Sequence, residues 1–182
     1  MKLLMVFVDG FEDTEAIATI DVLKRGNITV DAVSLMDTLS VKTKCGFCLV
    51  VDKLFKDVNI AEYDGLIIPG GPGSFKLMPS MDNLTNAIHY FAKNNKLVAS
   101  ICAAPHLVGR LGYFKDLDFT VHPGFENQVI GGNYRSDLGV CKAKNFITAK
   151  SMYYSLEFGY AIYEYFNGDG SSKALIEACK GN

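Results

Sequence analysis

One cysteine of this chain lies where a thiol is well placed to act as a nucleophile. Cys102 follows an apolar run that ends at Ile101, and it precedes Ala103-Ala104-Pro105, which begins a predicted helix. The N-terminal end of a helix is the positive end of its dipole and favours a thiolate. The small neighbours allow a tight strand–turn–helix elbow that exposes the sulfur. The alternative is a small, buried and inert cysteine, which is the commoner environment of this residue.

Two further features could assist such a thiolate. Gly70 and Gly71 follow another apolar strand, and their N–H groups, with that of Ala103, would suit an oxyanion hole. The alternative is an ordinary tight turn. The pattern is neither a Walker loop nor a dinucleotide fingerprint, so it gives little support to nucleotide binding.

Glu15 lies in the first turn of the first predicted helix. An acidic side chain there stabilises the helix dipole, and Glu12 and Asp13 have the same use. If Glu15 instead points toward the strand ends, it meets the Cys102 sulfur. A protonated carboxyl there could donate to the thiolate or transfer protons as a general acid and base.

Two histidines are candidates for proton transfer. His122, in Val-His-Pro-Gly, belongs to a loop late enough in the chain to fold back over Cys102. His106 follows Cys102 by four residues, so both fall on one face of the predicted helix, with the imidazole about one turn inside it. A lone histidine is more often neither a catalyst nor a ligand.

The other cysteines give weaker signals. Five cysteines, an odd number, argue against a disulfide framework in an intracellular chain. Cys45-Gly46-Phe47-Cys48 has the spacing of a redox pair, but Leu-Val-Val follows it and predicts an extended segment. Residues three apart on a strand point to opposite faces, which disfavours an internal disulfide. No second such pair exists to complete a zinc site.

The elements that must position these residues alternate between strand and helix. Strands are predicted at Leu3–Val8, Ile28–Ser34, Asp64–Ile68 and Lys96–Ile101, with a strand or hairpin at Val41–Val51. Helices are predicted from Ala16 to Gly26, at Met81–Asn94, from Ala103, at Met152–Phe166 and at Ser172–Lys180, and residues 119–147 are rich in strands and loops. This order predicts an α/β sandwich with an open, mainly parallel sheet. We find no linker or repeat, so we expect one domain over residues 1–182.

Composition excludes several classes of partner. The 182 residues carry a formal net charge of −2, and the basic residues are scattered. Nucleic acids and anionic membranes would therefore find no basic face. The apolar run at the N-terminus is too short for a signal peptide and meets Asp9 directly, and no stretch approaches the roughly 20 residues that span a bilayer. We expect a soluble, cytoplasmic protein.

Taken together, these motifs resemble the ThiJ/PfpI superfamily, and most closely the branch of the human Parkinson-disease protein deglycase. The resemblance covers nearly the full length. It is carried by Asp-Gly-Phe-Glu-Asp-Thr-Glu15, Leu-Ile-Ile-Pro-Gly70-Gly71, Ala-Ser-Ile-Cys102-Ala-Ala-Pro, Val-His122-Pro and Phe-Ile-Thr-Ala-Lys. It implies a flavodoxin-like three-layer sandwich of the class I glutamine amidotransferase type, with helices on both faces and a cysteine elbow.

The resemblance also implies roles. Cys102 matches the nucleophile, Glu15 the glutamate that contacts it, Gly71 and Ala103 the oxyanion amides, and His122 a proton-transfer histidine. Members are glutathione-independent glyoxalases that turn methylglyoxal into lactate, or deglycases. Others sense oxidative stress through the cysteine or act as chaperones. A homodimer that needs no metal or organic cofactor is expected.

Two departures bear on the substrate. Relatives carry an arginine from the third strand where this chain has Cys45, and their small loop after Thr148 is replaced by Ser151-Met152-Tyr153-Tyr154. We expect Tyr153 to reshape the pocket mouth. The intracellular peptidase branch has a histidine directly after the nucleophile where this chain has Ala103. Three hypotheses follow: an enzyme acting on small reactive carbonyls, a non-catalytic redox sensor, and a cysteine peptidase or amidase.

Overall fold

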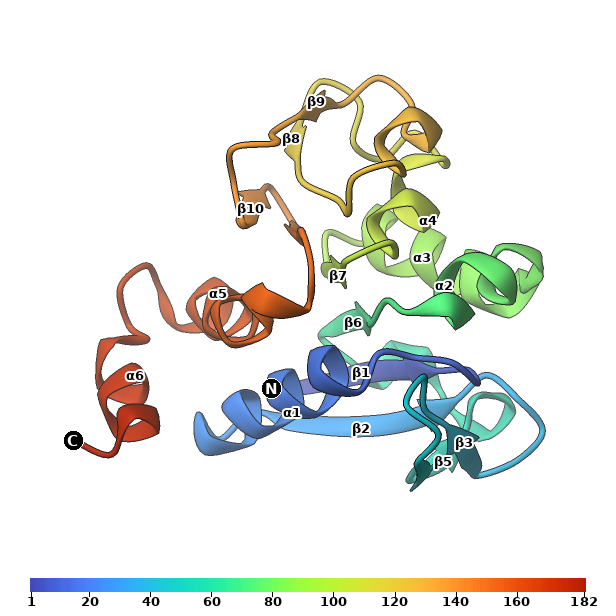
Figure 1. Ribbon diagram of the computed structural model, residues 1–182, viewed down its shortest axis with the longest axis horizontal. Helices are drawn as coiled ribbons and strands as arrows, with labels where there is room; N and C mark the ends of the chain where they lie inside the picture. Colours follow the sequence, from blue (N-terminus) through green and yellow to red (C-terminus); the bar gives the residue numbers. More distant parts are fainter.

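A seven-stranded sheet forms the centre of the molecule. The computed structural model describes all residues 1–182. Across the sheet the strands follow the order β10 (Val140–Ala143), β11 (Phe146–Ala149), β7 (Leu97–Ile101), β6 (Gly65–Ile68), β1 (Lys2–Phe7), β2 (Thr29–Ser34) and β5 (Lys53–Leu54). Neighbouring strands are parallel, except that β10 and β11 are antiparallel. Figure 1 shows β6, β1 and β2 side by side.

Helices cover both faces of this sheet. One face packs against α1 (Asp13–Arg25) and α5 (Ser155–Asn167), and the other packs against α3 (Asp82–Lys93) and α4 (Pro105–Gly109). A short helix, α2 (Pro72–Lys76), follows β6 at its carboxyl end. The predicted α/β sandwich with a mainly parallel sheet, of flavodoxin-like form, is therefore confirmed.

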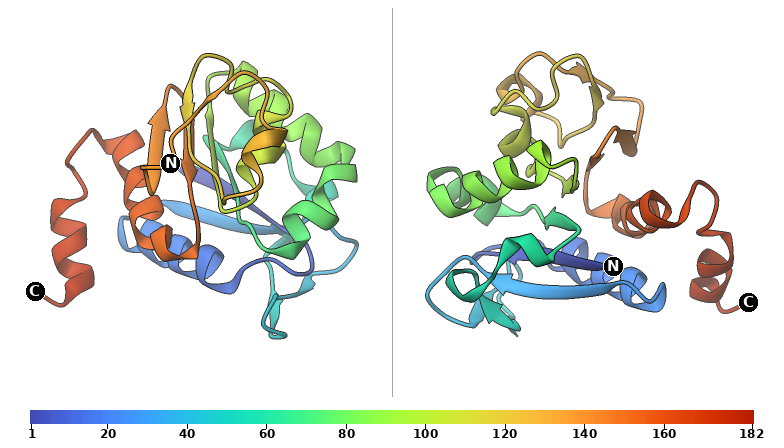
Figure 2. Two further views of the ribbon diagram at one scale, coloured as in Figure 1. Left: turned by 45° about the horizontal axis from the view of Figure 1, so that its top comes forward. Right: turned by 180° about the vertical axis from the view of Figure 1, so that it is seen from behind.

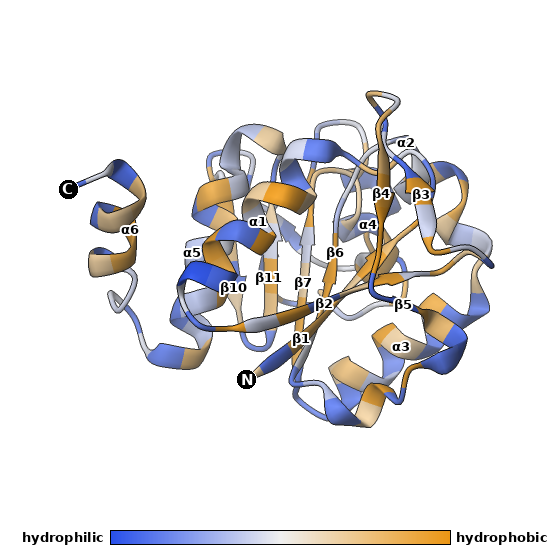
Figure 3. Cartoon of the chain, turned by 90° about the horizontal axis from the view of Figure 1, so that it is seen from below, coloured by the Kyte–Doolittle hydropathy of each residue, from blue (hydrophilic) through white to orange (hydrophobic).

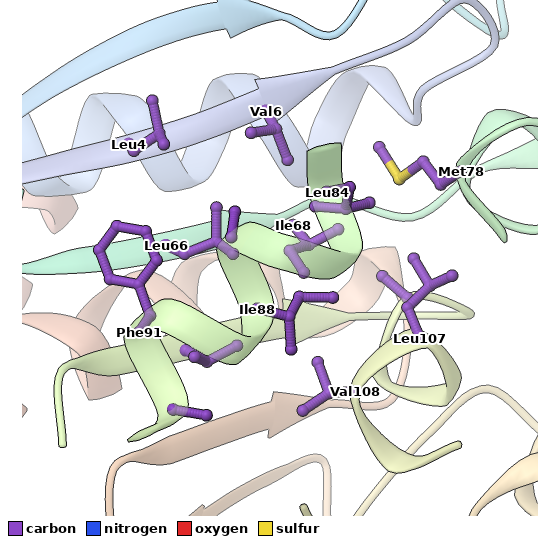
Figure 4. Packing of buried hydrophobic residues seen from close by; sticks show 14 of the residues in the cluster. Leu4, Val6, Leu66, Ile68, Met78, Leu84, Ile88, Phe91, Leu107 and Val108 are labelled. Carbon is purple, nitrogen blue, oxygen red and sulfur yellow. The ribbon is translucent and has the colours of Figure 1, made fainter. Parts of the chain in front are cut away.

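The central strands are apolar because both of their faces are buried. Along β1, Leu4 and Val6 point toward α3, while Leu3, Met5 and Phe7 point toward α1 and α5. Successive side chains of a strand alternate between faces, so a strand covered on both sides reads as a continuous apolar run. Figure 3 shows these strands as apolar, and Figure 4 shows part of the core under α3.

A small hairpin leaves the sheet after β2. Its strands, β3 (Ser40–Lys42) and β4 (Cys48–Val50), are antiparallel and project beyond the end of the sheet (Figure 3). The prediction of a hairpin within Val41–Val51 is confirmed. Phe47 and Val50 are 71% and 74% exposed, which is unusual for apolar side chains of this size.

The C-terminal third differs from the predictions in its details. Residues 119–147 contain short strands and loops, including β8 (Asp118–Phe119) and β9 (Asn133–Tyr134), which pair with each other. The helix predicted from Met152 begins at Ser155, because Met152–Tyr154 form a separate 3-10 turn. The last helix, α6 (Lys173–Lys180), buries no residue and lies at the periphery (Figure 2). No helix has both the length and the apolar character to cross a membrane.

Candidate active site

Three loops meet at one edge of the sheet. Because β1, β6 and β7 are parallel, the loops that follow them emerge side by side. The N–H of Glu12, after β1, donates to the carbonyl of Gly70, after β6, at 3.1 Å. The N–H of Gly73 donates in return to the carbonyl of Gly10 at 3.1 Å. Cys102, after β7, lies in the same pocket as Glu12 and Gly71.

Cys102 occupies a strained turn between β7 and α4. Its φ is +63°, in the left-handed region that side chains rarely adopt. Two backbone hydrogen bonds hold it there: its N–H donates to the Ala149 carbonyl, and its carbonyl accepts from the His122 N–H, both at 2.8 Å. The helix predicted from Ala103 begins at Pro105, because residues 102–104 form a turn between the strand and the helix.

Glu15 points into this site. Its side chain is 1% exposed, and Oε2 accepts from the Gly70 N–H at 2.8 Å. Oε1 is buried without a hydrogen-bond partner. The carboxyl lies beside the Cys102 thiol and is close enough for each group to affect the pKa of the other. Of the two interpretations of Glu15, the structure supports the one in which it meets the cysteine.

Gly70 allows the carboxyl and the thiol to approach each other. A Cβ at this position would lie 2.6 Å from Cys102 Cβ and 2.7 Å from Glu15 Oε2, and both distances are shorter than real contacts. Any side chain there would push Glu15 and Cys102 apart. Gly70 therefore has a steric role as well as donating its N–H to the carboxylate.

Two backbone amides lie near the sulfur. The N–H groups of Ala103 and Gly71 act to lower the pKa of the Cys102 thiol. Gly71 has a φ of +89°, and a Cβ on it would lie 2.5 Å from the backbone nitrogen of Glu12. Only glycine fits this turn, and its conformation aims the amide toward the thiol.

The carboxyl and the thiol compete for protons. Burial raises the pKa of Glu15 from 4.5 to about 7, although hydrogen bonds from Cys102 and Gly70 act in the opposite direction. Burial also raises the pKa of Cys102 to about 12, with further contributions from the charge of Glu15 and the hydrogen bond to it. The pair therefore holds two protons below about pH 7 and one proton between the two pKa values.

This result corrects the expectation that the helix end alone favours a thiolate. The two amides do lower the pKa of Cys102, but burial and the negative charge of Glu15 outweigh them. When Glu15 carries the shared proton, its charge disappears and the thiolate becomes accessible. The thiolate thus depends on a protonated Glu15 more than on the five-residue helix α4.

The pocket over Cys102 has a volume of about 220 Å³. The candidate residues that line it are Gly71, Cys102, Ala103 and His122, and it also contains Glu12, Lys44, Pro72, Phe75 and Phe125. Lys44 and the two phenylalanines were missed from sequence. Lys44 Nζ lies 2.7 Å from Glu12 Oε2 and places a cation in the lining of the pocket.

The two histidines take different places. His122 is exposed and lines the pocket, with Nδ1 3.0 Å from the carbonyl oxygen of Pro123. His106 is buried and does not line it; its Nδ1–H donates to the Ala103 carbonyl at 2.6 Å. No hydrogen bond joins an imidazole to the Cys102 sulfur. The interpretation of His106 as a pocket residue is therefore wrong.

Tyr153 was also misplaced. It is 80% exposed and lines a groove of about 430 Å³ between α5 and α6, away from the Cys102 pocket. Cys45 and Cys48 are exposed on the hairpin, and all five cysteines are free. No cluster of three or more histidine, cysteine or acidic side chains is placed to hold a metal ion.

A model of the DJ-1/PfpI family matches residues 1–165. The chain belongs to the DJ-1/PfpI family. It is 33% identical over 178 residues to Protein DJ-1 homolog B of Arabidopsis thaliana, covering 97% of this chain but only 40% of that relative. It is 30% identical over 178 residues to the glutathione-independent glyoxalase DJR-1.2 of Caenorhabditis elegans, covering 96% and 93% of the two chains.

The structure of oxidized Toxoplasma gondii DJ-1 superposes on this one with a TM-score of 0.88. The two chains are 26% identical, and the match covers 98% of this chain and 97% of the other. The similarity of fold thus extends over the whole sheet and its helices, and the resemblance to the DJ-1 branch is confirmed.

The proton competition can be tested by titrating Cys102. In Glu15→Gln the charge that raises the thiol pKa is gone, so we expect the pKa of Cys102 to fall by about one unit or more. The pKa of Cys102 is measured from the thiolate absorbance and from the alkylation rate of Cys102, each as a function of pH. Asp13→Asn removes a carboxylate from the same helical turn and should leave the pKa of Cys102 unchanged. An unchanged or higher pKa in Glu15→Gln would contradict the proposed coupling.

Proposed function

We propose that the chain is a cysteine-dependent enzyme that converts 2-oxoaldehydes such as methylglyoxal into 2-hydroxy acids without glutathione. The observation that carries the proposal is the buried carboxyl of Glu15 beside the Cys102 thiol, with the backbone amides of Gly71 and Ala103 near the same sulfur. The name of the Caenorhabditis elegans relative supports the same activity. Deglycase action on early glyoxal adducts would use the same addition to a carbonyl carbon.

The first step forms a carbon–sulfur bond. The Cys102 thiolate adds to the aldehyde carbon, and the carbonyl electron pair moves to the oxygen. The amides of Gly71 and Ala103 hold the resulting oxyanion, and Glu15 supplies the proton that completes a hemithioacetal. Glu15 is left as a carboxylate beside the carbon that must next lose a proton.

The second step is an isomerisation. Glu15 removes the hydrogen of the former aldehyde carbon as a proton, and the resulting enediol is reprotonated on the adjacent carbon. The first carbon is oxidised to a thioester and the second is reduced to an alcohol, so no external oxidant or reductant is consumed. Water then cleaves the carbon–sulfur bond, releasing the 2-hydroxy acid and the Cys102 thiol. We assign to His122, exposed at the pocket, proton exchange with solvent.

The peptidase hypothesis fits this geometry less well. Cysteine peptidases need a histidine within hydrogen-bond reach of the sulfur. Here His122 Nδ1 lies against the Pro123 carbonyl, and His106 is turned toward Ala103. The partner of Cys102 is instead a carboxyl, which suits proton transfer between adjacent carbons.

Lactate formation from methylglyoxal without glutathione tests the proposed activity. We expect turnover by the wild type, none by Cys102→Ala, and a fall of roughly 10²–10⁴-fold in Glu15→Gln, the usual range for a lost general acid and base. Cys179→Ala removes a thiol from α6 and should keep full activity. Unchanged consumption in Cys102→Ala, or no turnover by wild type with a reduced Cys102, would rule out this function.

A second candidate function is a redox sensor at the same cysteine. The similarity to an oxidized DJ-1 structure favours it, as does the protonated carboxyl that could stabilise a sulfinate. Peroxide followed by peptide mass analysis tests it. We expect a gain of two oxygen atoms at Cys102, reduced in Glu15→Gln. Oxidation of the exposed Cys45 and Cys48 ahead of Cys102 would count against a sensor.

We also propose that the chain forms a homodimer. A hollow of about 490 Å³ between α1 and the hairpin contains Phe47, and Val50 is exposed on the same hairpin. Burying these side chains against a second copy would remove apolar surface from water. Size-exclusion chromatography with light scattering should give twice the chain mass for the wild type and one chain mass for Phe47→Glu. A monomeric wild type would contradict the proposal.

A further inference from the structure

One side of the Cys102 pocket is aromatic. Phe75, from α2, and Phe125, from the loop after β8, contribute neighbouring rings with centroids 5.3 Å apart and planes tilted by 46°. Phe75 is 41% exposed, so its ring is available to a molecule in the pocket. Because Phe75 and Phe125 line the same pocket as Cys102, the two rings present an apolar wall to a molecule bound there.

The ring of Phe125 in this wall also contacts two imidazole rings. The ring of His106 lies 5.4 Å from that of Phe125, and His106 is itself fixed by its hydrogen bond to the Ala103 carbonyl. The ring of His122 approaches Phe125 edge-on at 6.3 Å. Phe125 is therefore positioned by contacts with two rings besides Phe75. His106 does not line the pocket, but its contact with Phe125 helps to position that ring.

The rest of the pocket lining includes polar groups. Lys44 and Glu12 form an ion pair there, and the backbone amides of Gly71 and Ala103 lie near the sulfur. The lining thus combines a charged pair, two aromatic rings and two backbone donors near the thiol. Its volume of about 220 Å³ equals that of about seven waters, each taking about 30 Å³ in the liquid, and exceeds what the methyl group of methylglyoxal fills.

We propose that this pocket selects 2-oxoaldehydes that carry a bulky apolar substituent. The substituent lies against Phe75 and Phe125 while the aldehyde faces Cys102 and the two amides. The inference rests on the proposed function, because it names the substrates within that class. Its physical basis is the removal of apolar substrate surface from water on the aromatic side.

The test compares an aryl with a methyl substrate. We expect kcat/KM for phenylglyoxal to exceed that for methylglyoxal by about tenfold or more in wild type, within the range that an apolar pocket provides. Phe75→Ala and Phe125→Ala should lower this ratio about tenfold, mainly through phenylglyoxal. Tyr165→Ala removes an aromatic ring from α5, outside the pocket, and should leave the ratio unchanged.

A second readout needs no turnover. Phenacyl bromide and bromoacetone both alkylate thiols, and their rates at Cys102 can be divided by their rates with free cysteine. We expect the normalised phenacyl preference in wild type to disappear in the two phenylalanine variants. If neither aldehyde is consumed, the proposed function fails and the substrate assignment fails with it, whereas the alkylation ratio still shows whether Phe75 and Phe125 recognise an aryl group next to Cys102. Equal ratios in wild type and in both variants would overturn it.

Discussion

The close approach of Glu15 and Cys102 across Gly70 is the constraint on which the rest of the site depends. It brings together a side chain from the first helix and one from the elbow after β7, and Gly70 leaves just enough space between them. The Gly70 N–H also fixes one carboxyl oxygen. The parallel order of β1, β6 and β7 makes this possible, because it places all three following loops at one edge. The sheet topology is thus the structural basis of the proton shared by the two side chains.

Burial of the two side chains brings the pKa of Glu15 close to neutral pH. A buried carboxyl resists ionisation, so the pKa of Glu15 rises to about 7, where it can both give and take a proton near neutrality. A buried thiol also resists ionisation, and the negative charge of Glu15 opposes the thiolate further. A proton on Glu15 removes that charge but not the effect of burial. The protonation states of the two side chains are therefore coupled.

Sequence was informative where local patterns decide structure. The apolar runs predicted β1, β6 and β7, and the small residues around Cys102 predicted the elbow; the three-layer fold followed from their order. Sequence patterns failed to predict those parts of the site that depend on packing between distant segments. Phe75 and Phe125 are 50 positions apart and meet only through the fold, and Lys44 reaches Glu12 because the hairpin folds back on the first loop. The position of Tyr153 was predicted wrongly because the neighbouring residues give no sign of the 3-10 turn at Met152–Tyr154. In this turn Tyr153 lies toward α6.

The strain at Cys102 and its support are of comparable size. A non-glycine residue in the left-handed region costs about 1–3 kcal/mol. The hydrogen bonds from Cys102 N–H to Ala149 and from His122 N–H to the Cys102 carbonyl contribute about 0.5–1.5 kcal/mol each. The elbow is thus held by its neighbours on both sides, one of them the segment that carries His122. The loop that carries His122 therefore both lines the pocket and stabilises the strained turn, and it does so through its backbone N–H rather than through the imidazole.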